Sequence, residues 1–329
     1  MTVRKLLPRY YDILEDQGTA QYLDCKQIPV DFTSSQSTDE LWALHDEALD
    51  LMNVGNTTPA LSLLDLKAEI AERLFQACCF CEHRCRINRR NTPGKCGVQE
   101  SRIALEFLHF GEEPMLVPSH TIFFSGCTFH CVFCQNWDIS QIPCGTTISP
   151  DQLEIIIEQR KKQGARNVNW VGGDPTSNLW YILTVLQQLH SNIAQIWNSN
   201  MYCSEETMKL LHRVIDIYLT DFKYGNDSCA KHLSGIDNYI AIVKRNHLLA
   251  YHHGEILIRH LVLPNHLDCC SKPVINYIAK NLPNAVVNIM AQYKPDFKAY
   301  EYKDISRTVT REEVSLVKEY AEKLGIHQI

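Results

Sequence analysis

The chain has 329 residues, of which 45% are hydrophobic and 21% are charged, a composition typical of a globular protein that buries a substantial core. The formal net charge is -6 and no basic run stands out, which argues against a nucleic-acid-binding protein. No segment reaches the roughly 18 apolar residues of a membrane span, and the opening residues lack the apolar core of a secretory signal. We therefore expect a cytoplasmic protein with no nucleic-acid or membrane partner.

The first part of the chain is predicted to be helical. Apolar spacing indicates helices around 9–23 and 38–53, and these residues carry no recognisable chemistry. A third helix over 61–76 leads directly into a cysteine cluster. We expect three regions: an N-terminal helical extension (1–60), a cysteine-rich metal-binding segment (61–118) and a barrel (119–329).

After residue 120, short apolar runs alternate with helical patterns. The predicted strands are 121–126, 167–172, 195–200, 215–221, 255–264 and 286–293. The predicted helices are 150–163, 177–191, 204–213, 236–251, 271–281 and 311–324. This alternation is typical of parallel strands joined by right-handed crossovers. Six units indicate an α/β fold, a partial (βα)6 TIM-like barrel, with chemistry at the carboxyl ends of its strands.

The fourteen cysteines are unevenly distributed, with five between 78 and 96 and three between 127 and 134. In a reducing compartment, such clusters favour metal or iron–sulfur ligation over disulfides. Cys127, Cys131 and Cys134 can hold three irons of a [4Fe–4S] cubane and leave the fourth iron without a protein ligand. The alternatives are a chance grouping of cysteines and a zinc site that recruits a fourth ligand such as His130.

This triplet, with the aromatic Phe133 before its last cysteine, resembles the signature of the radical S-adenosylmethionine (radical SAM) superfamily. The segments FFSGCTFHCVFCQNWDIS, VGGDPT, WNSNMY, LTDFKY, IRHLVLP and NIMAQYKP resemble the pyruvate formate-lyase activating enzyme-like branch, and within it the PflX-type subgroup. The resemblance extends from about Leu74 to the C-terminus. It implies an iron–sulfur oxidoreductase that reductively cleaves S-adenosylmethionine to a 5′-deoxyadenosyl radical, which abstracts hydrogen from a substrate.

The resemblance also implies a methionine pocket. Gly172, Gly173 and Asp174 match a glycine-glycine-acid motif that receives the methionine amino group, although the family usually has Glu where this chain has Asp. The alternative is a simple Gly-Gly-Asp-Pro turn. Asp221 and Lys223 match an acid-x-Lys pair in which the lysine opposes the methionine carboxylate; the alternative is an ion pair on a solvated loop.

Further candidates for the cofactor pocket lie at other strand ends. They are Phe133 beside the cluster, Asn198 and Asn200 for ribose or carboxylate hydrogen bonds, and Arg259 and Gln292 for the outer wall. The alternative for the polar residues is that they only satisfy loop backbone groups.

A second set of cysteines lies upstream. Four thiolates suit either structural zinc or an auxiliary iron–sulfur cluster, and buried unligated cysteines are the alternative. The set comprises Cys78, Cys81, Cys85 and Cys96. The isolated cysteines Cys25, Cys144, Cys203 and Cys229 are interpreted as ordinary core or surface thiols, and His266 as a surface or loop histidine. Cys269 and Cys270 are adjacent, and simple geometry disfavours their acting as a chelating pair.

The resemblance implies S-adenosylmethionine and a low-potential electron donor such as ferredoxin or flavodoxin as partners, under anaerobic conditions. The substrate is expected to be a glycyl residue of a partner protein. Two alternatives stay open: radical modification of a peptide or small molecule, and a non-catalytic iron–sulfur or zinc-binding protein. The methionine-pocket residues favour an enzyme, because a cluster carrier does not need them.

Overall fold

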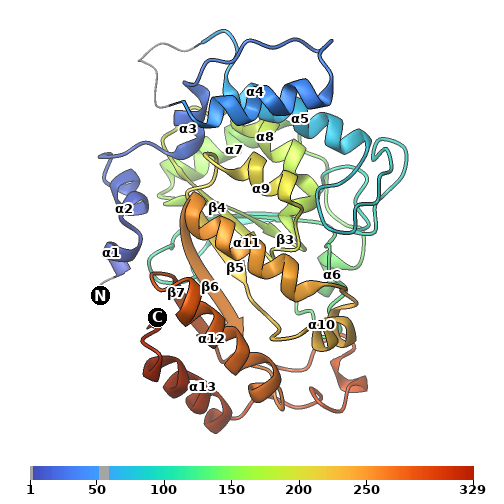
Figure 1. Ribbon diagram of the computed structural model, residues 1–329, viewed down its shortest axis with the longest axis vertical. Helices are drawn as coiled ribbons and strands as arrows, with labels where there is room; N and C mark the ends of the chain where they lie inside the picture. Colours follow the sequence, from blue (N-terminus) through green and yellow to red (C-terminus); the bar gives the residue numbers. More distant parts are fainter. Residues whose placement is uncertain (1–2, 52–58) are drawn as a thin grey trace.

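The computed structural model describes residues 3–51 and 59–329 and has a mixed α/β architecture built on one sheet (Figure 1). Its eight strands lie in sequential order. They are β1 (Ile103–His109), β2 (Ser119–Phe124), β3 (Asn167–Gly172), β4 (Ala194–Ser199), β5 (Ile217–Asp221), β6 (Glu255–Leu261), β7 (Val286–Met290) and β8 (His327–Gln328). β1 runs antiparallel to β2, and every later pair of neighbours is parallel. Within the described residues β1 and β8 are not paired, so the sheet is an open barrel.

Helices connect the successive parallel strands, as the sequence predicts. They are α7 (Pro150–Lys162), α8 (Leu179–Gln188), α9 (Glu205–Leu211), α10 (Asp227–Ser234), α11 (Tyr239–His253), α12 (Lys272–Asn281) and α13 (Arg311–Lys323). Short helical turns add η1 (Pro175–Asn178), η2 (Leu267–Ser271) and η3 (Ala299–Glu301), and a short helix α6 (Trp137–Ser140) follows the cysteine loop. The predicted α/β partial barrel of six parallel strands is therefore confirmed, and β1 and β8 extend it at its two edges.

Some predicted boundaries are wrong for local reasons. The helix expected over 9–23 is two helices, α2 (Pro8–Leu14) and α3 (Gln21–Lys26), because the chain turns between them at Gly18. The helix expected from 236 starts only at Tyr239, and α10 before it was not predicted. The helix expected over 38–53 is α4 (Thr38–Leu49), and residues 52 and 53 lie outside the described residues.

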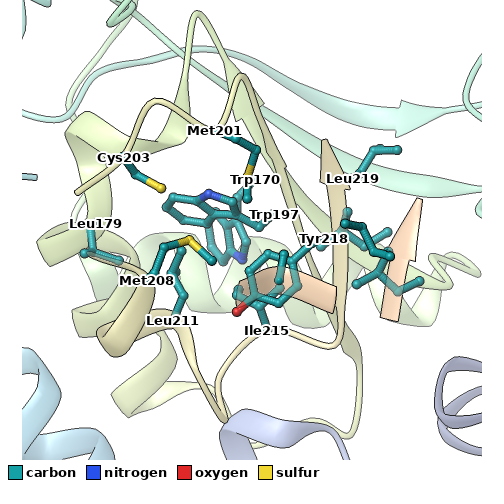
Figure 2. Packing of buried hydrophobic residues seen from close by; sticks show 14 of the residues in the cluster. Trp170, Leu179, Trp197, Met201, Cys203, Met208, Leu211, Ile215, Tyr218 and Leu219 are labelled. Carbon is teal, nitrogen blue, oxygen red and sulfur yellow. The ribbon is translucent and has the colours of Figure 1, made fainter. Parts of the chain in front are cut away.

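Side chains alternate across each strand, which decides what faces the barrel interior. On β3 and β4 the fully buried Trp170 and Trp197 are register partners and point outwards. Figure 2 shows their indole rings together, with Cys203 and Met208 beside them. The residues that follow each tryptophan, Val171 and Asn198, therefore point inwards and line a cavity.

The N-terminal segment packs across the amino ends of the strands, opposite that cavity. The carboxylate of Glu255, at the start of β6, accepts hydrogen bonds from the backbone N–H groups of Arg9 (2.6 Å) and Tyr10 (3.0 Å). The buried Asp216, just before β5, accepts one from the N–H of Gln21 (2.9 Å). Burial raises the pKa of Glu255 to about 7, although these hydrogen bonds oppose the shift.

Two helices precede the second set of cysteines, Cys78 to Cys96. α4 and α5 (Leu63–Gln76) lie at one end of the molecule in Figure 1, and α5 packs on both α4 and α8. Each begins with a capping box, in which a serine and an acidic residue three positions later satisfy each other's backbone N–H groups.

In the part of the chain that the structure describes, no helix has the length and apolar character needed to cross a membrane.

Candidate active site

A cavity of about 480 Å³ lies at the carboxyl ends of the parallel strands. Every residue that the sequence analysis assigned to the first cluster or to the cofactor pocket lines it, except Asp174. The predicted residues in its wall are Cys127, Cys131, Phe133, Cys134, Gly172, Gly173, Asn198, Asn200, Asp221, Lys223, Arg259 and Gln292. These residues come from the strands β2 to β7 or from the loops that follow them. The fold therefore brings together residues that lie up to 165 positions apart in the sequence.

The three cysteines of the first cluster follow β2 directly. The hydroxyl oxygen of Ser234 lies 2.9 Å from the sulfur of Cys131, and that of Ser140 lies 3.3 Å from the sulfur of Cys134. The amide nitrogen of Cys127 donates to the carbonyl of Cys96 (3.2 Å). Hydrogen bonds to ligating sulfurs are one of the means by which proteins tune an iron–sulfur cluster.

The spacing of these cysteines does not suit a single metal ion. Among the described residues, one group of three or more Cys, His, Asp or Glu side chains has all its ligand atoms within 4.8 Å of one another, and this triplet is not part of it. His130, the fourth ligand that a zinc site would need, is exposed and its Nδ1 lies 2.6 Å from the side-chain oxygen of Gln141. Wider spacing is expected when each thiolate binds a different iron.

Gly172 and Gly173 form a corner where β3 meets the cysteine loop. Gly172 has a φ of 123°, and a Cβ atom there would lie 2.1 Å from the amide nitrogen of Phe124. A Cβ at Gly173 would lie 1.9 Å from the carbonyl oxygen of Gly126 and 3.1 Å from Cβ of Cys127. Both positions therefore require glycine for the packing of protein backbone, in addition to any approach by a ligand.

Asp174 lies behind this corner rather than in the cavity wall. Its buried carboxylate accepts hydrogen bonds from the N–H of Thr176 (2.9 Å), the hydroxyl of Ser199 (3.0 Å) and the N–H of Asn200 (3.1 Å). Burial raises the pKa of Asp174, and these hydrogen bonds oppose the shift. In this structure, Asp174 joins the ends of β3 and β4, whereas the sequence analysis expected it to contact the cofactor.

Asp221 and Lys223 form an ion pair in the cavity wall, with 2.6 Å between Nζ and the carboxylate. Burial disfavours the ammonium, but the Asp221 carboxylate together with the thiols of Cys131 and Cys134 outweighs this effect, so the pKa of Lys223 is raised. The backbone N–H of Lys223 donates to the hydroxyl of Tyr239 (2.8 Å), which fixes the start of the loop. A charged lysine therefore faces the cavity beside Cys131 and Cys134.

Three other residues predicted for the cofactor pocket each have a different environment. The side-chain amide of Asn200 donates to the hydroxyl of Thr128 (2.9 Å), so this residue orders the cysteine loop. Phe133 packs edge-to-face on Tyr293, with 5.9 Å between the rings. Gln292 is exposed at the edge of the cavity.

Arg259 is held by two glutamates that the sequence analysis did not single out. Its guanidinium donates to Glu113 (2.6 and 2.8 Å) and to Glu112, and Glu112 lines the cavity. Asn169 and Asn288 donate to the same carboxylates (3.1 and 2.9 Å). The Arg259 charge is therefore compensated, and this wall carries a net negative charge. The glutamates lie between β1 and β2, outside the motifs that carried the prediction.

The second set of cysteines forms a compact loop after α5. Burial and the neighbouring thiols of Cys96, Cys78 and Cys85 raise the pKa of Cys81 well above its usual range, so the four side chains are within electrostatic reach of one another. No three of their sulfur atoms lie within 4.8 Å of one another. The carbonyl of Cys96 accepts the hydrogen bond from Cys127 noted above, so this loop packs directly on the first cysteine loop.

A buried arginine accompanies this set. Arg89 is 1% exposed, donates to the sulfur of Cys78 (3.6 Å) and to the carbonyl of Ser177 (3.3 Å), and lies over the ring of Phe75. It has no salt bridge to a carboxylate among the described residues. A buried guanidinium is costly without a negative partner.

A third group of possible metal ligands was not predicted from the sequence. Cys229, Cys269, Cys270 and His266 place one ligand atom each within 4.8 Å of all the others, although Cys229 was interpreted as an ordinary thiol and His266 as a surface or loop histidine. Adjacency was expected to disfavour Cys269 and Cys270 as a chelating pair, but the π-helical turn η2 brings their sulfurs to 3.9 Å. The spacing His-x2-Cys-Cys was the available signal, and Cys229 lies 37 residues upstream of His266.

Comparison with known proteins identifies the family. The model of the radical SAM superfamily matches residues 121–278. An uncharacterized protein of Methanocaldococcus jannaschii is 48% identical over 338 residues, covering 98% of this chain and 99% of that protein.

Similar solved structures are more distant. Streptococcus suis SuiB bound to the precursor peptide SuiA is 14% identical with a TM-score of 0.48, over 88% of this chain and 60% of that chain. Methylornithine synthase is 10% identical with a TM-score of 0.45, over 97% and 84%. A domain of the pyruvate-formate lyase-activating enzyme from Bacteroides vulgatus is 13% identical with a TM-score of 0.34, over 55% and 89%. Such distant likenesses carry no information about substrate. On the family match, residues 121–278 of this chain belong to the radical SAM superfamily.

Proposed function

We propose that this protein is an activating-enzyme-like radical SAM enzyme that abstracts hydrogen from a residue of a protein or peptide, with glycine as the target residue that its sequence motifs favour. The observation that carries the proposal is the single cavity that contains both the three cysteines and the glycine corner with Lys223. A cluster-binding protein without catalysis would not need the second group of residues.

The residues present fit a [4Fe–4S] cluster on Cys127, Cys131 and Cys134. Their three sulfurs do not all lie within 4.8 Å of one another, and hydroxyl groups lie beside two of them. When bound, the cluster supplies the electron that splits S-adenosylmethionine into methionine and a 5′-deoxyadenosyl radical.

The chain's own residues position the ligand. Lys223 offers a charged donor to the methionine carboxylate, and Asp221 holds that ammonium in place at 2.6 Å. The glycine corner leaves backbone groups open to the methionine end, and Asn198 is placed to donate to the ribose or the carboxylate. Asp174 keeps the glycine corner and Asn200 in register.

The size of the cavity favours a macromolecular substrate. Ligand pockets range over about 300–1,000 Å³, and this one, at about 480 Å³, must hold both the cluster and S-adenosylmethionine. The cluster and S-adenosylmethionine would occupy much of that volume. A loop or peptide can instead present one residue from outside, past the exposed Gln292.

The second cysteine set is proposed to bind an auxiliary iron–sulfur cluster. No three of its sulfurs lie within 4.8 Å of one another, whereas the ligand atoms of a single tetrahedral zinc ion lie closer together than this. The thiolates of a bound cluster would give the buried Arg89 the negatively charged partner that it otherwise lacks. The direct backbone contact between Cys96 and Cys127 makes this set a path for electrons from a donor such as ferredoxin or flavodoxin.

The substrate class can be tested by following deuterium. Extract from cells grown on deuterated glycine is divided by ultrafiltration into macromolecular and small-molecule fractions, and each is incubated anoxically with reduced, reconstituted protein. Deuterium is expected in 5′-deoxyadenosine only with the macromolecular fraction, and in neither with the Cys127→Ala control. Deuterium arising only from the small-molecule fraction would contradict the proposal.

A further inference from the structure

The third group of cysteines lies outside the cavity, at the junction of α10 and η2. Cys229 is in the first half of α10, His266 precedes η2, and Cys269 and Cys270 are within it. Nothing in the radical chemistry proposed above uses these residues, so their convergence requires a separate explanation.

The distances are those of ligands around one ion. The sulfurs of Cys229 and Cys269 are 3.9 Å apart, as are those of Cys269 and Cys270. Nδ1 of His266 lies 3.3 Å from the sulfur of Cys269, 3.6 Å from that of Cys229 and 3.8 Å from that of Cys270. A tetrahedral zinc ion with Zn–S of about 2.3 Å and Zn–N of about 2.0 Å places two sulfurs about 3.8 Å apart and a sulfur and nitrogen about 3.5 Å apart.

Neighbouring groups orient these ligands. Nε2 of His266, the nitrogen away from the cysteines, lies 3.1 Å from a carboxylate oxygen of Asp304. A carboxylate on the second ring nitrogen fixes the tautomer that leaves Nδ1 free to bind metal. The side-chain amide of Asn226 donates to the sulfur of Cys229 (3.3 Å) and to the carbonyl of Cys269 (2.8 Å), joining the two elements.

We propose that Cys229, His266, Cys269 and Cys270 bind one zinc ion in a closed tetrahedral site. Three thiolates and one imidazole form a ligand set used by structural zinc sites. The sulfurs are too close together for the thiolates of a cubane, which bind different irons. All four positions are filled by protein, so the ion is structural and has no place for a substrate.

The position of the site suggests what the zinc stabilises. The other end of α10 touches the cluster loop: the carbonyls of Leu233 and Ser234 accept hydrogen bonds from Val132 (2.9 Å) and His130 (3.2 Å), and the hydroxyl of Ser234 reaches Cys131. The ion would tie α10 to the segment after β6. It would thereby hold one wall of the cavity in place from the outer side.

Metal analysis of the full-length protein tests the site without relying on activity. Protein purified in air to remove iron is expected to keep one zinc per chain, and a Cys127→Ala/Cys131→Ala/Cys134→Ala variant is expected to keep it as well. Cys269→Ser and His266→Ala should lose it, while Cys144→Ser, which changes a cysteine outside all three sets, should not.

A milder variant tests the site even if the ligand substitutions prevent the protein from folding. Asp304→Asn keeps the four ligands and is expected to weaken zinc binding by about 10–100-fold, measured by competition with a chromophoric chelator. Cobalt substitution of the wild-type protein should give the visible spectrum of a tetrahedral, thiolate-rich site. Equal zinc content in wild-type and Cys269→Ser protein, a disulfide among these cysteines in the protein as isolated, or four additional irons in place of zinc would overturn the proposal.

Discussion

Replacing Gly173 with alanine is expected to disable the cavity while the barrel still folds. The new Cβ would lie 1.9 Å from the carbonyl oxygen of Gly126 and 3.1 Å from Cβ of Cys127. Both neighbours are held by backbone hydrogen bonds, from Gly126 to Ile139 and from Cys127 to Cys96. Relief of the clash therefore requires the cysteine loop to move by roughly 1 Å, and a misplacement of about 1 Å can cost about 10²-fold in rate.

The matched control is Gly325→Ala. Gly325 has a φ of 75° and no atom within 4 Å of an added Cβ, so its substitution strains the backbone far from the cavity. That strain costs about 1–2 kcal/mol, comparable to the overpacking cost of about 1–3 kcal/mol at Gly173. The two variants should thus have similar thermal stability.

The assay measures iron content and release of 5′-deoxyadenosine after anoxic reconstitution and reduction. Gly173→Ala is expected to release 5′-deoxyadenosine about 10²-fold more slowly than wild type, and Gly325→Ala at the wild-type rate. Wild-type release by Gly173→Ala protein would refute the assigned packing of the glycine corner against the cluster loop.

Three further substitutions probe the other parts of the account. Lys223→Met removes a charge-assisted hydrogen bond worth about 1.5–3 kcal/mol, so calorimetry should show S-adenosylmethionine binding weakened by about 10–100-fold; unchanged affinity would exclude Lys223 from the pocket. Asp174→Asn places an amide donor among three donors, so it should lower Tm while the folded protein binds S-adenosylmethionine normally; lost binding at an unchanged Tm would mean that Asp174 contacts the ligand. Glu255 has a pKa raised from 4.5 to about 7, so its contribution to stability is present below about pH 4.5 and is lost as pH rises towards 7. Urea unfolding of Glu255→Gln between pH 5 and 8 should therefore depend less on pH than that of wild type, and equal slopes would contradict the raised pKa.

The six parallel strands could be predicted because each is an apolar, β-branched or aromatic run bounded by turn residues. β3 matches its predicted range at both ends, since Gly172 ends the strand where the chain must turn. β1 was missed because it is a half-exposed edge strand whose apolar run is interrupted by Glu106. The two-residue β8 is too short to leave a pattern.

The cavity residues were predictable because parallel strands bring their carboxyl ends to one edge of the sheet. The sequence could not predict which partner each side chain would contact. Asp174 turns back to join two strand ends, and Arg259 is neutralised by glutamates from a loop outside every motif. The proposed zinc ligands were missed because a crossover and a π-helical turn, neither visible in the local pattern, bring Cys229 to His266.

The most direct test of the central claim is release of 5′-deoxyadenosine from S-adenosylmethionine by reconstituted, dithionite-reduced protein. Wild-type and Cys144→Ser proteins are predicted to release it, and Cys127→Ala protein is predicted to release none. Wild-type release no greater than that of Cys127→Ala would contradict the assignment of this cavity as a radical SAM active site.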